Sequence, residues 1–305
     1  MAEGRSIDAP LALPALRAPW RSYLQLTKPR VVSLIVFTVV VGMLLATPGP
    51  VPWTIFVFGS LGIGLIAACA AAINHLVDQR IDAIMSRTRG RPLPRGELDA
   101  PRAIAFATVL GGAGLALLLA STNALCAALT VLSLLGYAVV YSVFLKRRTP
   151  QNIVIGGAAG AAPPLLGWVA VTGHVEPGAL LLFTIVLLWT PPHFWALAIH
   201  RRDDYARAEV PMLPVTHGVA FTSARILQYT VALFAVTLLP VAIGMSGWLY
   251  LAGAVVLGAR FMAFAWRLRS DIALAMPTFR FSIVYLFGLF ALLLADHYLA
   301  AMLAR

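Results

Sequence analysis

Long apolar segments separated by short polar ones dominate the chain. Nine of them approach or exceed the roughly 20 mostly apolar residues that a transmembrane helix needs. These segments cover residues 31–47, 53–77, 103–120, 124–145, 153–172, 179–200, 225–245, 247–266 and 280–303. Their apolar residues run on without the period-two alternation of a membrane β-barrel. The pattern therefore predicts an all-α integral membrane protein with nine transmembrane helices.

Composition supports this class of protein. The chain is 60% hydrophobic and 11% charged, and its mean hydropathy is +0.87. A soluble domain carries about 25% charged residues, so these values exclude an ordinary soluble protein. Cys69 and Cys126 both lie inside apolar segments. They offer neither a disulfide framework nor the spacing of a metal site.

Positive charge is distributed asymmetrically along the chain. Of the 23 Lys and Arg residues, all except Arg305 precede the first apolar segment or lie in or beside alternate loops. The positive-inside rule places these segments in the cytoplasm and the C-terminus outside. This asymmetry accounts for the net charge of +11, so no nucleic-acid partner is expected. We predict a cytoplasmic tail over residues 1–27 and a nine-helix domain over 28–305.

Three oxygen-bearing side chains are spaced by four residues at the cytoplasmic end of the second segment. Asn74, Asp78 and Asp82 share one face of a helix at this spacing. Two stacked carboxylates with an amide oxygen above them repel one another unless a cation lies between them. Such a set suits Mg²⁺, and phosphate oxygens of a substrate can complete the coordination shell of the ion.

Three arginines follow this group. The guanidinium groups of Arg87, Arg89 and Arg91 are forked donors that suit phosphate oxygens. Carboxylates for a metal beside arginines for an anion indicate a site for a metal-bridged diphosphate. In the alternative, Asp78 and Asp82 only pair with Arg80 and Arg87 at a wet interface.

A second acidic group follows the sixth segment. It comprises Asp203, Asp204 and Glu209. Asp204 is a candidate ligand for a second metal ion facing the first. The alternative is an ordinary charged loop.

The segment NHLVDQRIDAIMSRTRGRPLP resembles the first aspartate-rich motif, N-x-x-x-D-x-x-x-D, of the UbiA-type intramembrane prenyltransferase superfamily. The resemblance implies nine helices around a central cavity open to lipid. It also implies transfer of an isoprenoid from a diphosphate to an aromatic or tetrapyrrole acceptor, with Mg²⁺. Further segments resemble the branch of this family that acts on heme: LTKPRV, YSVFLKRRTPQNIVIGGAAGAAPPLLGW, WTPPHFWALAI and DYARAEVPMLPV.

The resemblance assigns roles to individual residues. It implies a catalytic metal–diphosphate site formed by Asn74, Asp78, Asp82 and Asp204, with diphosphate contacts from Arg87, Arg91 and Lys146. Many family members carry a second acidic residue four positions after the equivalent of Asp204, where this chain has Ala208. The second metal ion is then either absent or bound with the help of Asp203. Glu209 stands where Gly or a small polar residue is expected.

The heme branch implies a specific reaction at the cytoplasmic face of the cell inner membrane. Farnesyl diphosphate and heme B are the expected substrates, and water adds to give heme O and diphosphate for heme–copper oxidase assembly. The bilayer, a heme A synthase and an oxidase assembly factor are candidate partners. The alternatives are a prenyltransferase for a quinone or chlorophyll precursor and a polytopic lipid or ion transporter. A transporter would hold its binding groups near the midplane of the membrane rather than at one interface.

One of the histidines in the sixth segment directly follows two prolines. In the heme branch, His193 is a candidate contact to heme iron or to a propionate. Alternatively, its ring satisfies backbone carbonyls that Pro191 and Pro192 leave free.

Overall fold

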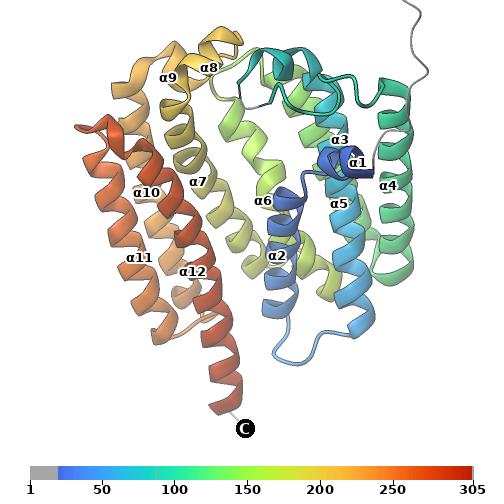
Figure 1. Ribbon diagram of the computed structural model, residues 1–305. Coiled ribbons are helices and arrows are strands. Elements are labelled where there is room, and N and C mark those ends of the chain that lie inside the picture. The colour runs from blue at the N-terminus through green and yellow to red at the C-terminus, as the bar shows by residue number, and fades with distance from the viewer. Residues whose placement is uncertain (1–19, 87, 304–305) are drawn as a thin grey trace, which may run out of the picture.

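The computed structural model describes residues 20–86 and 88–303, and these residues form helices without any strand (Figure 1). The long elements are α2 (Pro29–Leu45), α3 (Ser60–Ile84), α4 (Ala100–Ser121), α5 (Ala124–Leu135), α6 (Asn152–Thr172), α7 (Pro177–His200), α10 (Gly218–Ala242), α11 (Trp248–Arg267) and α12 (Ala275–Leu303). The short elements are α1 (Trp20–Leu26), α8 (Arg202–Arg207), α9 (Leu213–Thr216), the 3₁₀ helix η3 (Ile272–Leu274) and the π-helices η1 (Ile55–Gly59) and η2 (Gly136–Leu145). The predicted all-α class is confirmed.

The long helices coincide with the nine predicted apolar segments. In the described residues, eight helical stretches are long and apolar enough to cross a membrane. The pair α1 and α2, bent by 51°, supplies a ninth if it counts as one span. The chain is therefore a multi-pass membrane protein.

The short helix α1 lies inside the segment 1–27 that the sequence assigns to the cytoplasmic tail. Ser22 and Leu26, four residues apart on one face, are both buried. The ring of Tyr23 packs against that of Phe106 in α4, with 5.1 Å between centroids. Helix α1 is thus packed against the helical bundle.

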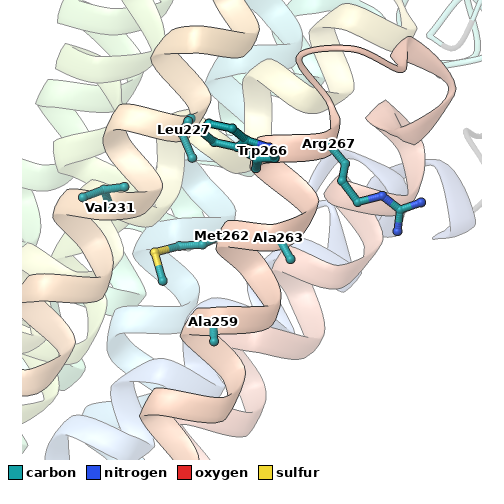
Figure 2. A pocket seen from close by; sticks show the side chains of 7 residues that line it. All are labelled: Leu227, Val231, Ala259, Met262, Ala263, Trp266 and Arg267. Atoms are coloured by element: carbon teal, nitrogen blue, oxygen red, sulfur yellow. The ribbon is translucent and has the colours of Figure 1, made fainter.

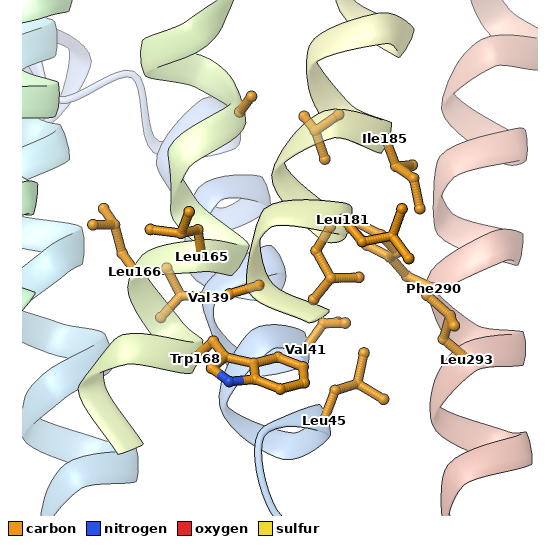
Figure 3. Packing of buried hydrophobic residues seen from close by; sticks show 14 of the residues in the cluster. Val39, Val41, Leu45, Leu165, Leu166, Trp168, Leu181, Ile185, Phe290 and Leu293 are labelled. Atoms are coloured by element: carbon orange, nitrogen blue, oxygen red, sulfur yellow. The ribbon is translucent and has the colours of Figure 1, made fainter. Parts of the chain in front are cut away.

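Apolar side chains of α2, α6, α7 and α12 meet in the largest buried cluster (Figure 3). Glycine brings the backbones of α2 and α6 together there. A Cβ atom on Gly42 would lie 1.9 Å from the carbonyl oxygen of Pro164, and one on Gly167 would lie 2.0 Å from that of Val39. Only glycine fits at either position, so these two helices touch backbone to backbone.

The two ends of the bundle differ. Figure 1 shows α8, α9 and the segment 88–99 together at one end, here called the polar end, and the C-terminal end of α12 at the opposite end. Hydrogen bonds tie helices together near the C-terminus. The Asp296 carboxylate of α12 accepts from the backbone N–H groups of Gly247 and Tyr250 at the start of α11, and His297 Nε2 lies 3.0 Å from the carbonyl oxygen of Thr47.

Candidate active site

Helix α3 carries the three oxygen-bearing side chains on one buried face. The helix continues to Ile84, beyond the predicted end at residue 77, and this extension lines up Asn74, Asp78 and Asp82. Each side chain belongs to a residue that is no more than 3% exposed. The amide Nδ2 of Asn74 donates to Asp78 Oδ2 at 2.9 Å, so the first two residues are directly coupled.

Each of these three residues is paired with a cationic side chain from a different part of the chain. Lys28, between α1 and α2, donates from Nζ to Asn74 Oδ1. Lys146 Nζ lies 2.6 Å from Asp78 Oδ2. Buried charges are tolerated when they are paired in this way.

The third pair joins the end of α3 to the segment that follows it. Arg91 Nη1 lies 2.6 Å from Asp82 Oδ2, and Thr88 Oγ1 donates to the Asp82 carbonyl oxygen at 3.1 Å. Arg80, considered as a partner from sequence, is exposed, and the carboxylates pair with Lys146 and Arg91 instead. Arg87 lies outside the described residues, whereas Arg89 is exposed.

The π-helix η2 positions two of the residues around this face. Ser142 Oγ accepts from Asn74 Nδ2 at 3.0 Å and donates to the carbonyl oxygen of Tyr137 at 2.9 Å. Lys146 follows directly at the C-terminal end of η2. π-Helical turns are rare and occur often at functional sites. Here the π-helix directs a hydroxyl group and an ammonium group toward α3.

The second acidic group reaches the same end of α3 through a serine. Asp204, buried in α8, accepts from Ser86 Oγ at 2.8 Å and pairs with Arg207 and, at 3.6 Å, with Arg201. The Ser86 hydrogen bond, followed by the two guanidinium groups, holds the pKa of Asp204 below its ordinary value. Asp204 therefore stays a carboxylate at neutral pH.

The backbone explains the expectation of a small residue at position 209. Glu209 has a φ of +52°, in the left-handed region that favours glycine. Its N–H donates to the carbonyl oxygen of Ala206 as the chain leaves α8. The small residue expected at position 209 thus corresponds to a turn that favours glycine.

His193 lies in a buried aromatic layer between α7 and α12. Its Nδ1 is 2.7 Å from Ser282 Oγ, and its ring stacks on those of Trp189 and Phe279 at centroid distances of 4.2 and 4.5 Å. Helix α7 runs through Pro191 without ending. The imidazole is therefore held by a serine of α12 rather than by carbonyls that the prolines free. This contact with Ser282 uses Nδ1 and leaves the other ring nitrogen, Nε2, outside it.

Two apolar grooves lie apart from these residues. One, of about 490 Å³, is formed by α10 and α11 and lined by Leu227, Val231, Ala259, Met262, Ala263, Trp266 and Arg267 (Figure 2). The other, of about 480 Å³, lies between α4 and α5. Both have almost wholly apolar walls, as suits surfaces that face lipid, and neither includes a predicted site residue.

Three further residues contact the candidate site residues but were not assigned a role from the sequence. Lys28, Ser86 and Ser142 reach Asn74 or Asp204 from other segments of the chain. Lys28 lies in LTKPRV, one of the segments that resemble the heme branch of the family. Ser86 and Ser142 have no feature in the sequence that distinguishes them from other serines.

Comparison with known proteins identifies the family. Residues 35–290 match the UbiA prenyltransferase family, and the chain belongs to it. This confirms the resemblance predicted from the aspartate-rich segment.

Two curated relatives are similar over nearly their whole length. The protoheme IX farnesyltransferase of Ectopseudomonas mendocina is 63% identical over 284 residues, which cover 92% of this chain and 95% of that protein. The protoheme IX farnesyltransferase of Azotobacter vinelandii is 62% identical over 291 residues, which cover 95% and 97%. The predicted similarity to the heme branch is thereby confirmed.

Solved structures share the fold at lower identity. A structure described as that of a digeranylgeranylglyceryl phosphate synthase matches with a TM-score of 0.78 and 20% identity, covering 92% of this chain and 98% of that one. A UbiA homologue from Archaeoglobus fulgidus bound to GPP and Mg²⁺ matches with a TM-score of 0.61 and 16% identity, covering 89% and 99%. The helical arrangement of this chain is thus that of UbiA-type proteins.

Proposed function

We propose that the chain transfers the farnesyl group of farnesyl diphosphate to a vinyl group of heme B, giving heme O and diphosphate. The observation that carries this proposal is the identity of about 60% to protoheme IX farnesyltransferases over almost the entire chain. The buried set of Asn74, Asp78 and Asp82, surrounded by cationic groups, supplies the chemistry that a diphosphate substrate requires.

The donor set on α3 fits Mg²⁺. All three candidate ligands offer oxygen atoms, and Asp78 Oδ1 is buried without a hydrogen-bond partner in the described residues. Within residues 20–86 and 88–303, no cluster of three or more His, Cys, Asp or Glu side chains could bind a metal ion. The site would therefore rely on two carboxylates, an amide and the substrate's own oxygens, as Mg²⁺ sites commonly do. When bound, Mg²⁺ would neutralise charge on the diphosphate.

The residues of the chain contribute charge stabilisation. As the allylic C–O bond breaks, its electron pair stays on the diphosphate, where Lys146 and Arg91 compensate the growing negative charge. Because both side chains are partly buried, solvent screens their charges only weakly. Asp204, linked to α3 through Ser86, orders the same end of the site.

The acceptor then forms the new carbon–carbon bond. The vinyl carbon of heme B attacks the farnesyl cation, water adds to the cation that results on the porphyrin substituent, and a proton is released. His193 holds the heme in register, by binding iron or a propionate through the imidazole nitrogen that Ser282 leaves free. The aromatic rings around His193 favour a flat, apolar partner.

The site lies at the cytoplasmic face of the cell inner membrane. The basic loops predict this orientation, with the N-terminus in the cytoplasm. A heme A synthase or an oxidase assembly factor receives the product.

Mass spectrometry of the reaction product tests the proposal. Purified protein with Mg²⁺, farnesyl diphosphate and heme B should yield a tetrapyrrole heavier by one farnesyl group and one hydroxyl group. The exposed Asp271→Asn variant is a matched control and should behave like the wild type. Diphosphate release with a quinone precursor but not with heme would favour the other prenyltransferase branch. Solute movement without diphosphate release would favour a transporter.

A further inference from the structure

The connection between α1 and α2 holds a cationic residue in an unusual backbone conformation. Lys28 has φ +50° and ψ +61°, in the left-handed region that residues other than glycine seldom adopt. Pro29 follows at the first position of α2. The two helices are bent by 51° at this point. Such a conformation persists only where its surroundings hold it, and residues of this kind cluster at functional sites.

In this conformation the side chain of Lys28 donates a hydrogen bond from Nζ to Asn74 Oδ1. The orientation of that amide is fixed, because Nδ2 donates to Asp78 Oδ2 at 2.9 Å and to Ser142 Oγ at 3.0 Å. Both protons of the amide nitrogen are thereby engaged. The amide oxygen, its sole acceptor atom, faces the ammonium group of Lys28.

Lys28 differs in this respect from the other two cationic groups. Lys146 and Arg91 each contact one oxygen of a carboxylate that has two, and Asp78 Oδ1 stays free of hydrogen bonds among the described residues. A metal ion could bind that free oxygen while Lys146 stays in place. A metal ion bound to Asn74 Oδ1 would instead lie directly against an ammonium group. The like charges would repel at close range in a poorly screened site.

We propose that Lys28 caps Asn74 Oδ1 while the metal site is empty and turns to a phosphate oxygen of the prenyl diphosphate when the metal ion binds. The metal ion and the diphosphate would then bind cooperatively. The diphosphate draws the ammonium group away from the metal ligand, and the metal ion neutralises the charge of the diphosphate. Lys28 would act as a positioning residue before binding and as a diphosphate ligand afterwards. This assignment rests on the proposed function and adds a basic residue that the aspartate-rich motif does not contain.

Metal binding without turnover tests the assignment. Mn²⁺ serves as the probe, and its binding to the purified full-length protein is followed by electron paramagnetic resonance, with and without farnesyl diphosphate. Lys28→Met should bind Mn²⁺ alone about tenfold more tightly than wild type, which is about 1.4 kcal/mol. The same variant should bind farnesyl diphosphate in the presence of Mn²⁺ about tenfold more weakly. Lys28→Arg should restore both values toward wild type.

Opposite changes in the two affinities, for Mn²⁺ alone and for farnesyl diphosphate with Mn²⁺, would support the assignment. A merely structural role of Lys28 would change both affinities in the same direction. Arg30→Met, at an exposed position two residues on, is the matched control and should change neither. If Lys28→Met does not fold, the same two affinities are measured for Lys28→Gln. Unchanged or weaker binding of Mn²⁺ alone would overturn the assignment, as would unchanged diphosphate affinity. A wild-type protein that binds no Mn²⁺ even with farnesyl diphosphate would instead overturn the proposed function, and the assignment with it.

Discussion

Individual side chains at the polar end compensate one another's charge. Asp78 and Asp82 are buried, and each lies 2.6 Å from a cationic nitrogen atom. A buried charge without a partner is costly, so removal of one member leaves the other to be stabilised by substrate, metal or water. Because each carboxylate and its cationic partner compensate one another, substitution of a carboxylate tests the proposed reaction directly.

The variant Asp82→Ala should lower heme O formation by about 10²–10³-fold, since loss of a transition-state electrostatic contact commonly costs about 2.7–4 kcal/mol. The change removes a proposed metal ligand and releases Arg91 from its ion pair. Product formation is measured at saturating Mg²⁺, with Asp271→Asn as the control. Turnover close to that of the wild type would show that Asp82 is no ligand.

The variant His193→Ala should weaken heme binding and turnover while farnesyl diphosphate affinity stays within a few-fold, because the contacts of Asp78 and Asp82 are untouched. Heme titration followed in the Soret band measures the effect, and a changed band shape distinguishes iron ligation from a propionate contact. His200→Ala, at the exposed end of the same helix, is the control. Normal heme binding with only a lower unfolding temperature would assign His193 to packing.

The sequence predicts the local part of the candidate site but not the contacts from distant segments. A spacing of four is a local property, so the amino-acid sequence alone places the aspartates of α3 on one face of a helix. Lys28 and Ser142 reach Asn74 across 46 and 68 residues of sequence, and no local pattern encodes such contacts. Asp296 likewise caps the start of α11 from another helix, across 49 residues.

At the scale of elements, hydropathy is a good guide to length and a poor guide to local geometry. The predicted segments match the long helices because burial in lipid requires continuous apolar residues. The π-helices η1 and η2 were not predicted, since a wider turn uses the same apolar residues as an α-helix. The bend at Lys28 also escaped prediction, as did α1.

Glycine substitutions test the close contact between α2 and α6. Gly167→Ala should lower the free energy of unfolding by about 1–3 kcal/mol, because its Cβ would overlap the backbone of Val39. Gly160→Ala in the same helix is the control, since nothing lies within 4 Å of its added Cβ and alanine favours a helix. Thermal unfolding in detergent compares the two. Equal unfolding temperatures would contradict a backbone contact at Gly167.

For the whole molecule, the charge distribution predicts that the polar end faces the cytoplasm. Figure 1 shows the segment 88–99 at the end opposite the C-terminal end of α12. Cysteines introduced at the exposed positions Gly90 and Val175 should therefore react with an impermeant thiol reagent from opposite sides of the membrane. The native Cys69 and Cys126 are buried and give a low background. Labelling of both new cysteines from one side would contradict the predicted topology.

The hydrogen bonds of Asp296 and His297 have a mechanical consequence. They tie α12 to the start of α11 and to the connection after α2, far from the polar end. We infer that this restraint near the C-terminus leaves α11 and α12 more freedom to separate at the polar end. Admission of a substrate as broad as a porphyrin then needs no helix to unfold, only the polar end to spread.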